Sequence, residues 1–104
     1  MKVIHGSAVF EELLNLSAYI AFENENAAQR FLDACNETFR FLAEHQHTGV
    51  AQQFRSKELQ AVRRWRVKGF EKYLIFYLPV TDGVKILHIV HSARDYRTLF
   101  DEDS

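Results

Sequence analysis

Apolar residues follow a helical spacing in the first half of this chain and an alternating spacing in the second half. Residues 2–5, KVIH, precede Gly6 and predict a short strand, and Ser7 is placed to cap a helix. The apolar residues that follow recur every three or four positions and predict a first helix to about Phe22. Its expected buried face carries Phe10, Leu13, Leu14, Ile20 and Ala21, with Ser17 in register.

A second amphipathic helix is predicted directly after the first. Asn24 and Asn26 both suit its N-cap, and the sequence leaves that choice open. Its apolar face carries Ala28, Phe31, Leu32, Cys35, Phe39 and Leu42. Two such helices joined by a short link predict an antiparallel hairpin. Because Cys35 lies inside the apolar face, we expect a packed core thiol and not a nucleophile.

The first strand of the second half, residues 62–68, is predicted to be two-sided. Side chains alternate along a strand, so Trp65 and Val67 are expected to face the core. Arg64, Arg66 and Lys68 then share the other face, about 7 Å apart for a rise of ~3.3 Å per residue. Such a row is in most proteins a solvated strand face, and this alternative stays open. Three like charges on one face repel, however, which is easier to explain if an anionic partner docks there.

Two further strands follow as a predicted hairpin. Residues 72–78 are apolar or aromatic on both faces, which predicts a central strand that ends at Pro79. The pair Asp82-Gly83 predicts the centre of a two-residue turn, and a last strand then runs over residues 84–91. Within that strand His88 is expected to be a hydrogen-bonded core histidine.

Together these elements predict an α+β fold in a single domain over residues 1–104. We expect an N-terminal strand and an antiparallel helical hairpin packed on an antiparallel β-sheet, in the order β-α-α-β-β-β. Residues 45–58 follow neither spacing and are predicted to be the longest loop. A short helical turn is possible near residue 100, before the acidic tail of residues 101–104.

Composition excludes several classes of protein. With 104 residues, 47% of them hydrophobic, the chain suits one core. No apolar run approaches the ~20 residues of a membrane span, and the N-terminus lacks the apolar centre of a signal peptide, so we expect a cytoplasmic protein with no membrane partner. A single cysteine allows no internal disulfide, and no Cys/His spacing suits zinc, His45 and His47 included. We therefore expect no metal and no cofactor.

The net charge of −1 conceals a difference between the two halves. Residues 1–44 carry three Lys or Arg against seven Asp or Glu, whereas residues 55–97 carry ten against four. The second half therefore predicts a basic surface, which suits either a nucleic acid or an acidic protein segment.

Four segments, in order, resemble the ParE branch of the RelE/ParE toxin superfamily, whose members are the toxin halves of bacterial type II toxin–antitoxin pairs and include plasmid stabilisation toxins. Residues 23–32, ENENAAQRFL, are similar to the family's Asn-Pro-x-Ala-Ala-x-Arg-Phe pattern, with Glu25 at the proline position. The other three are residues 41–49, FLAEHQHTG, residues 67–77, VKGFEKYLIFY, and residues 91–95, HSARD. The resemblance covers nearly the whole chain.

The resemblance implies a helical hairpin on an antiparallel sheet, and a cognate antitoxin, ParD-like or similar, whose flexible segment wraps the toxin. ParE-like members inhibit DNA gyrase, whereas RelE-like members cut messenger RNA on the ribosome. When this sequence is aligned with the RelE-like ribonucleases, the positions of their phosphate-facing cations are occupied by Arg64, Arg66 and Arg94. Two further positions of the ribonuclease set are Tyr73, in place of an arginine, and Phe100, in place of a proton-transferring tyrosine.

These substitutions favour the gyrase-inhibiting branch, and we expect no catalytic residue. Arginine stays protonated near neutral pH, so it binds phosphate but is a poor general base. The expected surface for target and antitoxin carries Arg64, Arg66, Lys68, Arg94 and Arg97. Two alternatives stay open. One is a ribosome-dependent mRNA endoribonuclease in which Arg64, Arg66 and Arg94 stabilise the phosphate, and the other is an inactive member that only binds antitoxin.

Overall fold

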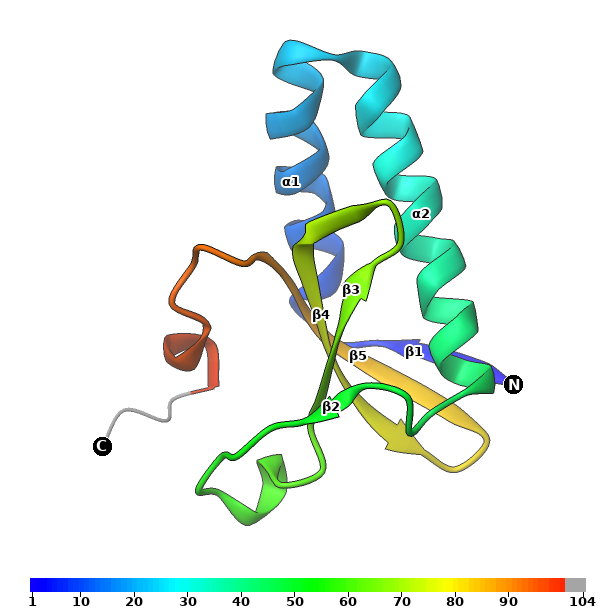
Figure 1. The fold of residues 1–104 in the computed structure, drawn as a ribbon, viewed down its shortest axis with the longest axis vertical. Coiled ribbons are helices and arrows are strands. Elements are labelled where there is room, and N and C mark those ends of the chain that lie inside the picture. The colour runs from blue at the N-terminus through cyan, green and yellow to red at the C-terminus, as the bar shows by residue number, and fades with distance from the viewer. Residues whose placement is uncertain (101–104) are drawn as a thin grey trace.

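Two helices pack on one face of a five-stranded sheet in the computed structural model, which describes residues 1–100 (Figure 1). The acidic tail of residues 101–104 lies outside the described residues. The elements are β1 (Lys2–His5), α1 (Val9–Glu23), α2 (Glu25–Glu44), β2 (Val50–Ala51), the 3-10 helix η1 (Lys57–Leu59), β3 (Arg63–Val67), β4 (Phe70–Val80), β5 (Gly83–His91) and the 3-10 helix η2 (Tyr96–Phe100). The predicted α+β class, helical hairpin and C-terminal helical turn are confirmed.

The sheet is mixed, which corrects the expectation of a purely antiparallel sheet. Its order is β1-β5-β4-β3-β2, and β1 runs parallel to β5 while the other neighbours are antiparallel. The amide of Lys2 donates to the carbonyl of Asp82, so β1 begins beside the start of β5. A four-residue strand such as KVIH carries no information about its partner strand, and the direction of β1 is therefore set by tertiary packing.

The helices cover one face of the sheet through a core that both contribute to. From α2, the predicted apolar face is confirmed, with Phe31, Cys35, Phe39 and Leu42 at most 1% exposed. Asn24 is the N-cap of α2, because its Oδ1 accepts from the amide of Ala27 at 3.0 Å. Burial raises the pKa of the Cys35 thiol to about 12, as a packed core position requires.

The predicted buried face of α1 is partly wrong. Phe10 and Leu14 are exposed, and the residues that meet the core are Val9, Leu13, Leu16 and Ile20. Ser7 does not cap the helix, because Ala8 holds the N-cap position without a side-chain hydrogen bond. The helix has apolar residues on two sides, so its periodicity alone does not define which side is buried.

The opposite face of the sheet has its own apolar cluster. Phe54, Val62, Leu74, Phe76 and Val90 are buried there, and η1 and η2 contribute Leu59, Tyr96, Leu99 and Phe100. Strand β4 is thus covered on both faces, as predicted for a central strand. It continues through Pro79, which is tolerated because β3 pairing ends opposite Tyr77 and leaves Pro79 with one neighbour, β5.

Two local features differ from the prediction. The hairpin turn is Thr81-Asp82, one position earlier than expected, since Val80 pairs with Gly83 and Asp82 takes a φ of 62°. The long loop also contains a strand, because Val50 and Ala51 pair with β3.

Neither helix within residues 1–100 is long and apolar enough to cross a membrane.

Candidate functional site

Strand β3 presents Arg64 and Arg66 on the sheet face opposite the helices. Arg64 pairs with Phe76 and Arg66 with Leu74, and both partners belong to the apolar cluster on that face. Directly paired residues project from the same side of a sheet, so the two arginines border that cluster. Trp65 packs against the helix-side core instead. The alternation predicted for these residues is confirmed.

Lys68 does not continue this row. The register shifts between Arg66 and Val67, β3 ends at Val67, and Gly69 turns the chain with a φ of 80°. The amide of Lys68 donates to Thr38 Oγ1 at 3.2 Å, and its Nζ lies 3.8 Å from Glu37 Oε1 on α2. The expectation of three cations in one row is therefore wrong: the row consists of Arg64 and Arg66, and Lys68 points toward α2. The reason is the bulge after Arg66, which interrupts the alternation of side chains along the strand.

After β5, Arg94 lies on the segment that leads into η2, and Arg97 lies within η2. The ring of Tyr96 lies 4.9 Å from that of Phe76, and the ring of Phe100 lies 5.4 Å from it, between centroids. These contacts hold η2 on the same sheet face as Arg64. Within residues 1–100 no ion pair is formed by Arg64, Arg66, Arg94 or Arg97. We call these four residues the arginine face.

A groove of about 470 Å³ lies beside the arginine face, between α2 and the hairpin of β3 and β4. It is lined by Glu37, Thr38, Phe41, Trp65, Arg66, Lys68 and Glu71. Phe41 is 40% exposed and stacks on Trp65, with ring centroids 6.4 Å apart. Within the described chain β2 pairs only with Arg63 and Arg64, so the outer edge of β3 from Trp65 onward has no strand beside it. We call this site the edge groove.

The two positions that would complete a ribonuclease set do not add an acid–base group to the arginine face. Tyr73 packs on Phe31 of α2, with ring centroids 4.9 Å apart, so it lies on the helix side of the sheet. Burial, and to a smaller extent Tyr19, raises the pKa of Tyr73. Phe100 contacts the rings of Phe54, Phe76 and His88. Neither residue can transfer a proton near Arg64 at neutral pH.

His88 is hydrogen-bonded, as predicted, and its partner is Glu12 of α1. His88 Nδ1 lies 2.7 Å from Glu12 Oε2, and the amide of Ile89 donates to Glu12 Oε1 at 2.9 Å. Strand β1 pairs with β5 only as far as Ile86. Beyond that point the Glu12 carboxylate, and not a neighbouring strand, accepts the backbone hydrogen bond from β5. Sequence reasoning missed Glu12, because nothing in local spacing relates residues 76 positions apart.

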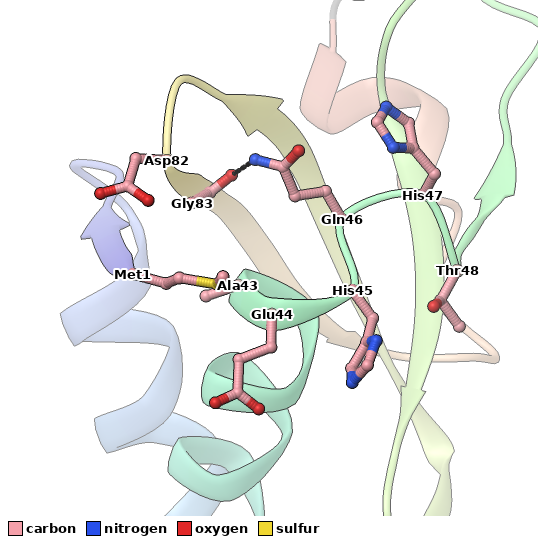
Figure 2. Close-up of a pocket in the computed structure, with 9 residues that line it drawn as sticks. All are labelled: Met1, Ala43, Glu44, His45, Gln46, His47, Thr48, Asp82 and Gly83. Carbon is pink, nitrogen blue, oxygen red and sulfur yellow. Dashed lines mark hydrogen bonds between the residues drawn. The ribbon is translucent and has the colours of Figure 1, made fainter.

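The loop after α2 is anchored to the sheet, and this anchoring fixes β2 beside β3. Gln46 Nε2 donates to the carbonyl of Val80 at 2.6 Å and to that of Gly83 (Figure 2). The Tyr77 hydroxyl donates to the Gln46 carbonyl and accepts from the amide of Gly49, each at 2.8 Å. Arg63 donates to the Gly49 carbonyl at 2.6 Å, so this arginine is structural.

A hollow of about 470 Å³ beside this loop, between the end of α2 and the turn before β5, contains His45 and His47. The two rings point away from one another (Figure 2). Within residues 1–100 no three His, Cys, Asp or Glu side chains come together as a metal site would need. Among the described residues, the hollow therefore lacks the three clustered ligands of a typical protein metal site.

A comparison with known protein families gives a match over most of the chain. A family model described as "ParE toxin of type II toxin-antitoxin system, parDE" matches residues 5–96. No curated protein matches the chain. The matched span includes both helices, β2 to β5 and Arg64, Arg66 and Arg94, and it ends before Arg97 and Phe100.

Proposed function

Because this chain belongs to the ParE toxin family of type II toxin–antitoxin systems, we propose that it inhibits DNA gyrase by binding through the arginine face, and that a cognate antitoxin silences it. The observation that carries the proposal is the pairing of Arg64 with Phe76 and of Arg66 with Leu74, which turns both guanidinium groups to one face. No ion pair within residues 1–100 neutralises them. Arg66 donates one hydrogen bond to the carbonyl of Glu71 at 3.3 Å, and the charge of both guanidinium groups can serve an anionic partner.

The chemistry of the arginine face supports binding and not catalysis. A guanidinium stays charged and donates in a planar fork that matches carboxylates and phosphates. General acid–base catalysis needs a group that gains and loses a proton near the operating pH. Phe100 has no such group, and Tyr73 faces the helices. The imidazole of His88 projects from the same sheet face, but its Nδ1 is hydrogen-bonded to Glu12 at 2.7 Å and serves the fold. Inhibition by occupying a surface of gyrase, or of its DNA, requires only the cations.

The edge groove supports the second half of the proposal, an antitoxin. A flexible segment must gain enough contact to offset its ordering entropy, and an exposed strand edge beside an aromatic floor supplies both hydrogen bonds and apolar area. Trp65 and Phe41 line the groove, together with the cations Arg66 and Lys68 and the carboxylates Glu37 and Glu71. Glu37 lies 3.8 Å from Lys68, so Arg66 is the cation left to attract an acidic segment. An acidic segment lying there would also cover Arg66, so antitoxin and gyrase would compete for this residue.

The test is a gyrase supercoiling assay with purified wild-type toxin and the double variant R64Q/R66Q. We expect wild type to stop supercoiling and the double variant to lose most of this effect. The matched control is Arg40→Gln, which neutralises an exposed arginine on α2, outside the arginine face, and should inhibit as wild type does.

Other outcomes would replace the proposal. If R64Q/R66Q inhibits gyrase as fully as wild type does, Arg64 and Arg66 are not needed for inhibition and the arginine face is not the binding surface. If wild type leaves gyrase active but cuts ribosome-bound messages, the chain is an endoribonuclease with Arg64, Arg66 and Arg94 around the phosphate. If it does neither and still binds its antitoxin, the chain is an inactive member of the family.

A further inference from the structure

Helix α1 carries a second apolar face, turned away from the sheet and from α2. Its inward side chains are Val9, Leu13, Leu16 and Ile20. On other sides of the helix Phe10 is 77% exposed, Leu14 56%, Tyr19 75% and Phe22 92%. A helix that is apolar on opposite sides is normally covered on both. The helical hairpin extends beyond the end of the sheet (Figure 1), so the sheet gives no cover to the far end of α1.

The exposed residues form a continuous ridge. Phe10, Leu14, Ala18 and Phe22 follow one another at intervals of four, which places them in one row along the helix, and Tyr19 stands next to Phe22. Such a row fits the groove between side chains of a second helix. At 1.5 Å per residue, α1 offers about 22 Å of contact length to that helix. We call this row the α1 ridge.

Charge near the α1 ridge restricts what can cover it. Residues 6–29 contain Glu11, Glu12, Glu23 and Glu25 and no lysine or arginine. Glu12 is engaged by His88, whereas Glu11, Glu23 and Glu25 are exposed. The ridge is therefore bordered by negative charge, the opposite of the arginine face.

Two occupants are disfavoured by this border. An anionic membrane surface would meet like charge at both ends of the helix, from Glu11 and Glu23. A second copy, with its α1 antiparallel to this one, would bring Glu11 of one chain toward Glu23 of the other. A helix with lysine or arginine on its flanks meets opposite charge at both ends of the ridge.

We propose that the α1 ridge docks an amphipathic helix of a partner protein, apolar on one side and flanked by Lys and Arg. This interaction surface is separate from the arginine face and does not depend on which target the toxin acts upon. Phe22 and Phe10 anchor the two ends of the partner helix, and Ala18 lets its backbone approach closely in the middle. Glu11 and Glu23 select basic flanks.

The test uses two synthetic helical peptides of equal length that share one leucine face and differ only in their flanks, lysine in one and glutamate in the other. Binding to the full chain is followed by amide chemical shifts. We expect the lysine peptide to bind, with shifts concentrated on α1, and the glutamate peptide to bind at least about tenfold more weakly. Phe22→Ser should weaken the lysine peptide by at least about tenfold, as loss of a buried aromatic side chain implies.

Two further variants separate the ridge from general effects. Asn36→Ser changes an exposed residue of α2 and should leave peptide affinity unchanged. Glu23→Lys should weaken the lysine peptide and strengthen the glutamate peptide. Because Phe22 and Glu23 are exposed, neither substitution should alter the melting temperature, which is measured alongside.

Three results would overturn the proposal. The first is equal affinity for the two peptides, or no binding of either. The second is a wild-type dimer in sedimentation equilibrium that Phe22→Ser abolishes, which would assign the ridge to a second copy. The third is co-sedimentation with phosphatidylserine vesicles that Phe22→Ser abolishes, which would assign it to a membrane surface.

Discussion

Replacing Tyr77 with Phe removes one oxygen atom and tests whether a single hydroxyl holds the loop after α2. Tyr77 is fully buried, and its hydroxyl joins two loop groups, the amide of Gly49 and the carbonyl of Gln46. A buried polar group left without its partner costs about 1–3 kcal/mol. The bond to Gly49 is buried and that to Gln46 partly buried. We therefore expect Tyr77→Phe to lower the free energy of unfolding by roughly 2–4 kcal/mol.

This loss is large against the 5–15 kcal/mol typical of a domain, so urea unfolding followed by Trp65 fluorescence resolves it. The matched control is Tyr73→Phe, on the same strand and the same face, whose hydroxyl makes no hydrogen bond within residues 1–100. That control should change the unfolding free energy by less than about 0.5 kcal/mol.

The reasoning also predicts where Tyr77→Phe acts. Gly49 precedes β2, and Val50 pairs with Arg64, so loosening the loop should speed hydrogen exchange at residues 48–52 before the rest of the sheet. If Tyr77→Phe costs no more than Tyr73→Phe and leaves this exchange unchanged, the hydroxyl does not hold the loop, and Gln46 and Arg63 anchor it alone.

Four further predictions follow from the core and the arginine face. Phe76→Ala should cost about 3–5 kcal/mol and leave little soluble protein, and an unchanged melting temperature would show that β4 is not central. Replacing Arg64 and Arg66 with Glu should lower the affinity for antitoxin and make that affinity less dependent on salt concentration. An unchanged affinity would show that these two arginines face solvent in the complex and do not contact the antitoxin. Because burial raises the pKa of Cys35 from 9.0 to about 12, the unfolded thiol ionises first. Stability should then fall as pH rises from about 9 toward 12, and the folded thiol should resist iodoacetamide at neutral pH, so rapid alkylation of folded protein would count against burial. Phe100→Tyr should leave toxicity unchanged, whereas a gain in RNA cleavage of about 10²-fold or more would indicate a ribonuclease site.

Elements with one clear periodicity could be predicted from the sequence. The buried face of α2 was predicted correctly because apolar residues occupy mainly one side of this helix. For α1, which is apolar on two sides, the spacing was satisfied by Phe10 and Leu14 as well as by Val9 and Leu16, and only packing against the sheet decided between them. The same surplus of apolar residues is what leaves a ridge for a partner.

The candidate site was predicted as far as local alternation extends. Arg64 and Arg66 lie on one face because β3 is regular there, and Lys68 departs because the bulge after Arg66 ends the alternation. Contacts between distant segments could not be predicted. The carboxylate of Glu12 at the edge of β5 and the Tyr77 hydroxyl under the Gly49 loop depend on how separate elements dock, which no spacing within one element records.

The distribution of charge follows from which strands are buried. Strand β4 is covered on both faces, so cations cannot project from its middle, and they appear on β3 and on the segment after β5. Both positions border the cluster around Phe76, where Tyr96 and Phe100 hold η2 against the sheet. The relative placement of Arg64 and Arg97 therefore depends on apolar contacts, whereas the exposed guanidinium groups contribute little to stability. For this reason charge substitutions on the arginine face should alter binding without unfolding the protein, and core substitutions should abolish both together.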